Sequence, residues 1–168
     1  MKFLLSSLLL FVLFSGCGYK PASYYAKNAI EGAVYVDLKV DIDNSENSVF
    51  VKDAMNEMIL NQFKVNLVED KAKADTYVTV ALSSVSHSSI STDSDGYVQS
   101  YRTTVNIKMT YQKIDEKMKT INVNDYYDYT VDSDSTITDQ KKKLAIKSAS
   151  TKALNNVFSK IAVNSMKD

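Results

Sequence analysis

The chain has 168 residues, of which 45% are hydrophobic and 24% charged, and its 20 basic and 20 acidic side chains balance. This composition is typical of one globular domain and excludes a chain that is disordered throughout. Because the net charge is zero, there is no whole-chain basic field, and we expect no nucleic-acid partner. One cysteine excludes an internal disulfide and a cysteine-rich zinc site, and one histidine leaves few routes to a catalytic centre. We therefore expect no enzyme activity, no metal and no cofactor.

The N-terminus has the pattern of a secretory signal. Lys2 precedes an apolar run from Phe3 to Phe14, which is shorter than the roughly 20 residues that a membrane-spanning helix needs. Two small residues follow, and the only cysteine, Cys17, comes next, as in a bacterial lipobox, where cleavage leaves an acylated N-terminal cysteine. We predict a lipoprotein signal peptide over residues 1–16 and lipidation of Cys17. The alternative is an ordinary signal peptide followed by a free thiol.

The residue after the cysteine predicts where the protein is sorted. Gly18 stands where an aspartate retains many bacterial lipoproteins in the inner membrane, so the pattern resembles that of outer-membrane lipoproteins. Several acyl chains, each contributing about 0.8 kcal/mol per buried CH₂, make a stable membrane anchor. We expect a lipid-anchored protein of the cell outer membrane, with residues 17–32 as a polar and aromatic lead-in.

A domain is predicted over residues 33–165, and its first half contains two strands and a helix. Hydrophobic residues alternate from Val34 to Ile42, which predicts a half-buried strand. The segment 43–48 supplies turn residues and possible helix caps, and it precedes an apolar stripe that starts at Val51 and predicts a helix to about residue 63. Alternation returns over residues 74–86, and the polar stretch 88–96 predicts a turn.

The second half of the domain contains two more strands and a long helix. Residues 97–111 alternate over a length that is unusual for a strand. A turn at 115–119 leads to a fourth alternating segment that ends near Val131. Residues 132–139 supply acceptor side chains for the start of a helix, which we expect from about Gln140 to Asn164.

This order of elements predicts an α+β fold: a four-stranded sheet with two helices packed on one face, in the order β-α-β-β-β-α. Each strand has one apolar side and each helix has one apolar stripe, so packing the helices on a single face buries both sets. The opposite face of the sheet is expected to be polar and rich in Thr, Asn, Asp, Lys and Tyr.

Three clusters could suggest other chemistry, and each has a simpler explanation. His87 lies among serines beside the predicted turn, without an acid to orient it, so we interpret it as a solvated loop histidine. The aspartates of segments 93–95 and 132–139 lack the spacing and closing glutamate of a calcium loop, which favours turn and capping roles. The run Lys141–Lys143 could touch anionic head groups but is more typical of a solvated helix face.

Several features together resemble one known family. The predicted mature start Cys-Gly-Tyr-Lys-Pro at 17–21, the β-α-β-β-β-α order and the long strand within GYVQSYRTTVNIKMTY at 96–111 occur in one chain. In combination they resemble the lipopolysaccharide-assembly lipoprotein family LptE, over essentially the whole chain.

The resemblance implies a function and partners. Members of the family are non-enzymatic outer-membrane lipoproteins that plug the lumen of a large β-barrel, LptD, help it to assemble, and bind lipopolysaccharide (LPS) on its way to the cell surface. The implied partners are therefore an LptD-like β-barrel and LPS. A polar sheet face suits such a role, because barrel lumens are lined with polar side chains.

The resemblance also indicates candidate contact residues. Here the turns at 91–96 and 132–135 are acidic, where the family carries basic residues. Arg102 and Lys108, on the polar side of the long strand, are the nearest basic residues, and with Tyr126 they are the candidate LPS or barrel contacts. Two alternatives stay open: a free-standing, periplasm-facing binding or scaffolding lipoprotein of the outer membrane, and a lipoprotein hydrolase.

Overall fold

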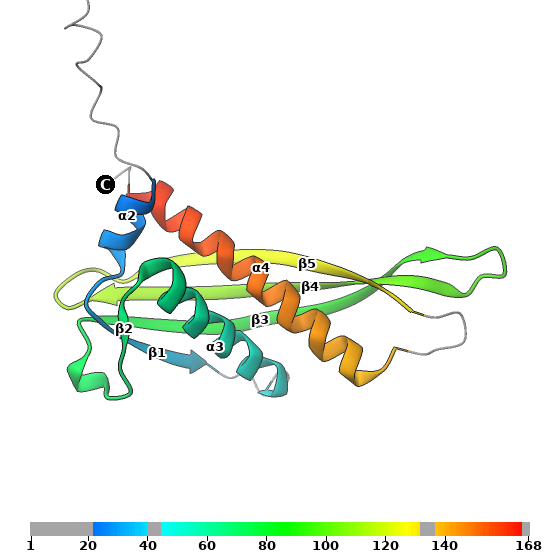
Figure 1. Cartoon of the computed structure of the whole chain (residues 1–168), viewed down its shortest axis with the longest axis horizontal. Coiled ribbons are helices and arrows are strands. Elements are labelled where there is room, and N and C mark those ends of the chain that lie inside the picture. Colours follow the sequence, from blue (N-terminus) through cyan, green and yellow to red (C-terminus); the bar gives the residue numbers. More distant parts are fainter. Residues whose placement is uncertain (1–21, 40–44, 132–136, 166–168) are drawn as a thin grey trace, which may run out of the picture.

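A mixed sheet of five strands, in the order β2-β1-β3-β4-β5, forms the fold (Figure 1). The computed structural model describes residues 22–39, 45–131 and 137–165. Its longer elements are α2 (Ala22–Ala29), β1 (Ala33–Lys39), α3 (Ser45–Met58), β3 (Thr76–Thr92), β4 (Val98–Lys113), β5 (Lys119–Thr130) and α4 (Asp139–Ser165). Its short elements are a π-helical turn (Ile59–Phe63), β2 (Asn66–Leu67) and a 3₁₀ turn (Lys71–Lys73).

Strands β3, β4 and β5 form an antiparallel meander that sets the length of the molecule. The β3–β4 pairing runs from Thr76 opposite Lys113 to Thr92 opposite Val98. On the other side of β3, β1 runs parallel to it, and their pairing ends at Lys39 opposite Ala81. Beyond this point the meander continues beside α3 and α4, and only the end of the β3–β4 hairpin extends past these helices (Figure 1).

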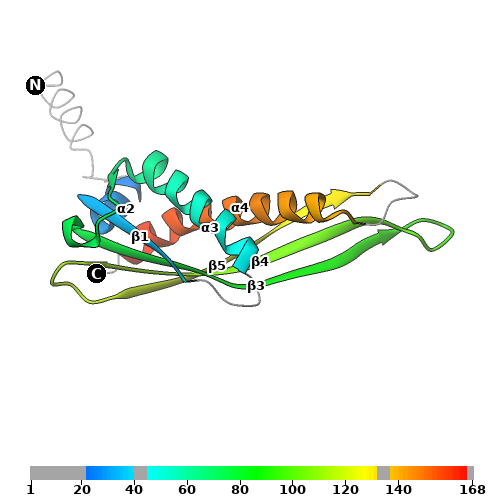
Figure 2. The same ribbon diagram turned by 90° about the horizontal axis from the view of Figure 1, so that it is seen from below.

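All three α-helices cover the same face of the sheet, as the edge-on view shows (Figure 2). The core lies between the two layers and consists of apolar side chains from both. The largest fully buried side chains are Ile30, Val34, Val51, Met55, Ile59, Val78, Val80, Leu82, Ile107, Met109, Leu154 and Ile161. The predicted α+β class and the one-sided packing are therefore confirmed, with five strands instead of four.

The additional elements lie where the sequence has no repeating pattern. Strand β2 contains two residues, too few to show alternation, and it pairs in parallel with the start of β1. Helix α2 lies in the expected lead-in, yet its Ala26 and the following Ile30 are fully buried in the core. The folded domain therefore includes the second half of that lead-in.

Two predicted turns are partly regular structure. Ser45 to Ser48 form the first turn of α3, because serine and asparagine are as compatible with a helix start as with a loop. Residues 88–92 belong to β3, and the turn contains only the residues that follow. The prediction was wrong there because residues 88–92 pair with β4 along the hairpin, and polar residues can form such a paired strand without a continuous apolar side.

A β-bulge in β3 changes which residues face the core. Leu82 pairs with Ile107 and Ser84 pairs with Asn106, so Ser83 is an extra residue. Before the bulge the even-numbered residues of β3 are buried; after it, Val85 packs against the core.

Among the described residues, no helix is both long and apolar enough to cross a bilayer.

Helix α4 also closes the outer edge of β5. Lys160 Nζ donates to the carbonyl of Asn122 at 2.7 Å, and Lys152 Nζ donates to that of Tyr126 at 3.4 Å. Asn156 Nδ2 donates to the Asp125 carboxylate at 3.1 Å. Edge carbonyls that already accept hydrogen bonds, beside charged side chains, are poor templates for another strand, so this edge is protected against strand addition.

Candidate functional site

The sheet surface opposite the helices is the candidate site, and we call it the open face. It consists of the side chains at alternate positions of the meander: Ser84 on β3, Arg102, Thr104, Asn106 and Lys108 on β4, and Asn122, Asn124, Tyr126 and Asp128 on β5. All but Arg102 and Thr104 are exposed. No described helix covers this side of the sheet (Figure 2). The polar residues are ordered by the strands beneath them; for example, Asn106 Nδ2 donates to Ser84 Oγ at 2.8 Å.

A three-residue cluster stands out on the open face. Arg102 lies opposite Asp128 in the β4–β5 register, and its guanidinium donates from Nε and Nη2 to the two carboxylate oxygens, both at 2.7 Å. The Arg102 Cζ atom also lies 3.7 Å from the ring centroid of Tyr126. A bidentate ion pair stacked on an aromatic ring fixes all three side chains in one arrangement.

The ion pair offsets the charge of both partners. The hydrogen bonds from Arg102 lower the pKa of the Asp128 carboxyl, with a smaller contribution from the nearby positive charges of Arg102 and Lys152. The hydrogen bond to Asp128 likewise raises the pKa of Arg102. The cluster is therefore ionised but nearly neutral as a unit, and an anion would have to compete with Asp128 for the guanidinium.

The three predicted contact residues are only partly brought together. Arg102 and Tyr126 touch, whereas Lys108 lies six residues further along β4, about 20 Å away at 3.3 Å per residue. Sequence reasoning missed Asp128 as a member of the site. The alternation along β5 predicts that Asp128 lies on the polar face of the sheet. Its pairing with Arg102 depends in addition on the register between β4 and β5, which is determined by the turn between these strands and by the packing of their buried residues.

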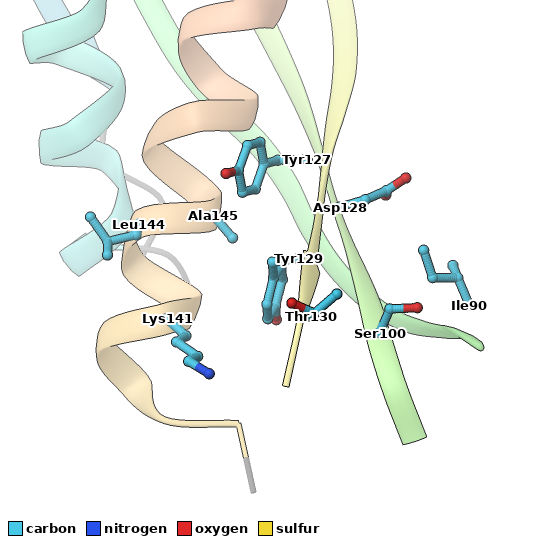
Figure 3. Close-up of a pocket in the computed structure, with 9 residues that line it drawn as sticks. All are labelled: Ile90, Ser100, Tyr127, Asp128, Tyr129, Thr130, Lys141, Leu144 and Ala145. Atoms are coloured by element: carbon cyan, nitrogen blue, oxygen red, sulfur yellow. The ribbon is translucent and has the colours of Figure 1, made fainter. Parts of the chain in front are cut away.

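A hollow adjoins this cluster at the end of β5 (Figure 3). Its volume is about 590 Å³, and Tyr127, Tyr129 and Asp128 from β5, Ile90 from β3, and Lys141 and Ala145 from α4 line it. Tyr129 stacks on Tyr101 with ring centroids 6.1 Å apart. The Tyr129 hydroxyl is buried without a hydrogen-bond partner among the described residues. A mostly apolar hollow with a lysine on its lining can take an amphiphilic ligand.

The tip of the β3–β4 hairpin is built around one aspartate. Asp93 Oδ1 accepts hydrogen bonds from the backbone of Asp95 at 3.0 Å and Tyr97 at 2.8 Å, and Asp93 Oδ2 accepts one from Gln99 Nε2 at 2.8 Å. Gly96 completes the turn with φ +87°. The expected turn role of this aspartate is confirmed, while segment 132–135 lies outside the described residues.

His87 lies in β3, so its interpretation as a loop residue was wrong. The polar residues around it form a paired strand instead of a turn, and its Nδ1 lies 2.8 Å from Oγ1 of Thr103, which is fully buried. Partial burial, and secondarily the charge of Lys142, lower the pKa of His87, so the ring is neutral at pH 7.

Within the described residues, no three His, Cys, Asp or Glu side chains group as metal ligands.

The fold and the open face together define a class of protein: a two-layer α+β domain with a long, ordered polar sheet surface. The family model described as "LptE: Lipopolysaccharide-assembly" matches residues 35–161, and the chain belongs to this family. The family is one of non-catalytic lipoproteins, and membership makes this chain an outer-membrane-associated lipoprotein involved in lipopolysaccharide assembly. Cys17, the predicted lipidation site, lies outside the described residues.

Solved structures share the fold at low sequence identity. Lipoprotein B from Nitrosomonas europaea, solved by NMR and described as uncharacterized, is 10% identical, with a TM-score of 0.55, over 89% of this chain and 94% of that one. A minor lipoprotein from Acinetobacter baumannii is 8% identical, with a TM-score of 0.50, over 79% of this chain and 91% of that one. No curated protein matches the sequence.

Proposed function

We propose that this lipoprotein seats in the lumen of an LptD-like β-barrel of the outer membrane, helps that barrel to assemble, and assists the insertion of LPS at the cell surface. The observation that supports this most is the open face, a polar sheet surface made rigid by a hydrophobic layer behind it. A barrel lumen presents polar side chains and few apolar ones, so its natural complement is a surface of this kind. In this proposal Cys17 carries the acyl chains that hold the protein in the membrane.

The Arg102–Tyr126–Asp128 cluster is suited to be the centre of the barrel contact. Arginine and tyrosine are enriched among the residues that dominate interface energies. Because these side chains are already fixed by the bidentate pair, binding costs little additional side-chain entropy. Since Asp128 offsets the Arg102 charge, the cluster fits a polar wall better than a bare phosphate.

Co-purification tests the barrel contact. We expect the wild-type lipoprotein to leave the membrane in mild detergent tightly bound to a large β-barrel. Replacing Tyr126 by alanine removes the ring on which Arg102 stacks, and we expect the yield of the complex to fall about tenfold, as for a hot-spot residue worth about 1.4 kcal/mol or more.

The matched control is Lys147→Ala, at an exposed position on α4 away from the open face. This variant should keep the complex at the wild-type level. A wild-type chain that elutes alone as a monomer would contradict the proposal and favour a free-standing periplasmic binding or scaffolding lipoprotein. Equal losses in both variants would remove the open face from the contact.

We further propose that LPS is contacted at the hollow beside β5. The acidic turn at Asp93 and Asp95 repels lipid phosphates, and Asp128 already occupies the guanidinium of Arg102. The hollow instead combines mostly apolar walls with Lys141 on its lining. These groups complement an acyl chain that ends in an anionic head group.

Binding of purified LPS to the immobilised full-length protein tests this second contact. Ile90→Glu places a carboxylate on the wall of the hollow, where desolvation and phosphate repulsion both oppose binding, and we expect an affinity at least about tenfold lower. Val49→Glu is the control, because Val49 is an exposed β-branched residue on α3, outside the hollow. Unchanged affinity of the Ile90 variant would show that LPS binds elsewhere.

A further inference from the structure

Exposed apolar side chains gather at the end of the molecule opposite the hairpin tip. Ile114 and Met118 lie in the turn between β4 and β5 and are 53% and 63% exposed. Tyr24 on α2 and Val163 near the end of α4 are 44% and 50% exposed. The β4–β5 turn, α2 and the C-terminal end of α4 all lie at this end (Figure 1). We call these four residues the apolar end.

The length of the tether places this end close to a membrane. Helix α2 begins at Ala22, five residues after Cys17, and an extended chain spans at most about 3.6 Å per residue. The start of α2 is therefore held within about 18 Å of an acylated Cys17. Tyr24, the turn residue Glu116 and Lys119 at the start of β5 line one shared hollow, so the turn lies beside α2. This step rests on the proposed acylation of Cys17.

The chemistry of the turn fits the boundary between head groups and acyl chains. Its sequence, Lys-Ile-Asp-Glu-Lys-Met-Lys over 113–119, places Lys117 next to the exposed Met118, whereas Lys113, next to Ile114, is ion-paired with Glu31 at 2.6 Å. Lysine can lay its alkyl stem along an apolar surface and keep its ammonium group among lipid head groups. The turn is also held in place, because Ile114 N donates to the carbonyl of Asp75 at 3.0 Å and Glu116 N donates to that of Lys113 at 3.1 Å.

We propose that the apolar end docks on the lipid leaflet that holds the acyl chains, with Ile114 and Met118 inserted into its interfacial layer. The domain thus contacts the bilayer through its own side chains as well as through the acyl chains of Cys17. This contact orients the domain. Strand β3 has 17 residues at about 3.3 Å each, so the tip of the hairpin stands about 56 Å from the docked end.

A single-tryptophan experiment tests the docking, because the chain contains no tryptophan. Met118→Trp is expressed as the full-length, acylated lipoprotein and reconstituted into phosphatidylcholine vesicles with bromine on the upper acyl carbons. We expect at least about twofold quenching of its fluorescence relative to vesicles without bromine, because interfacial elements bury their apolar side chains about 5–10 Å deep. The matched control is Tyr97→Trp, at a 65% exposed position beside the hairpin tip, and it should show no quenching.

The possible outcomes distinguish membrane anchoring by the acylated Cys17 from insertion of the apolar end into the leaflet. A vesicle-bound protein in which Met118→Trp is not quenched overturns the docking and leaves the anchor intact; this is also the result expected if the apolar end contacts a barrel protein instead. Equal quenching at both positions overturns the orientation. Absence of acylation at Cys17 by mass spectrometry overturns the anchor and the docking together. Ile114→Trp repeats the measurement if the circular dichroism of the first variant shows that it does not fold.

Discussion

Replacing Ile107 by alanine is expected to lower the free energy of unfolding by about 2–5 kcal/mol, whereas replacing its neighbour Lys108 changes it by about 0.5 kcal/mol or less. The two residues are adjacent in β4 and face opposite sides of the sheet. Ile107 is 1% exposed and packs in the core between the sheet and the helices, so the substitution leaves a cavity. Lys108 lies on the open face, where alanine removes no packing.

Urea unfolding of the two variants, followed by circular dichroism, measures this difference. The two substituted residues are neighbours in the same strand, so the two variants differ mainly in which face of the sheet loses a side chain. A cost at Lys108 equal to that at Ile107 would mean that the open face is packed against the protein itself, and the proposed contact with a barrel lumen would fail with it.

Replacing Gly32 by alanine is expected to cost about 2–3 kcal/mol of stability, more than the same change at Gly96. Both glycines have positive φ, +74° and +87°, where a side chain costs about 1–2 kcal/mol. At Gly32 a Cβ would also lie 2.4 Å from Oδ2 of Asp75, the atom that accepts a hydrogen bond from Ala33 N. Displacing that carboxylate removes a bond worth about 1 kcal/mol between the chain after α2 and the start of β3.

Gly96 is the matched control, because a Cβ there meets nothing within 4 Å. Its alanine variant should show only the backbone cost, about 1–2 kcal/mol. Thermal unfolding of both variants gives the comparison. Equal losses would mean that Asp75 moves aside freely and does not fix the junction between α2 and the sheet.

The molecule divides its proposed tasks among separate surfaces. The open face presents an ion pair and amides to a polar wall, the hollow beside β5 offers an apolar cavity to an amphiphile, and the apolar end faces the leaflet. The helices contribute indirectly: they bury the other side of the sheet, and two lysines of α4 occupy carbonyls at the outer edge of β5. The same helix that stabilises the core therefore also discourages strand addition at this edge.

Alternation along the chain was enough to predict which residues of β4 and β5 face the core. Val105, Ile107 and Met109 share one parity in the sequence and are all buried, and the residues between them are polar. A strand has a period of two and each face meets one environment, so local sequence carries this information. The same holds for the stripe of α4, whose helix begins and ends within about one residue of its expected limits.

The contacts that make a site of the open face were decided only by the tertiary structure. The pairing of Arg102 with Asp128 needs the β4–β5 register, and the change of parity in β3 needs a bulge at Ser83 that no local residue pattern marks. Strand β2 exists because Val68 N reaches the carbonyl of Val34 at 2.9 Å across the chain, not because its two residues favour a strand. The sequence by itself determined the two layers and their apolar sides, since burial follows local periodicity. Register, bulges and edge pairs depend on contacts between distant segments, and only the folded chain brings those segments together.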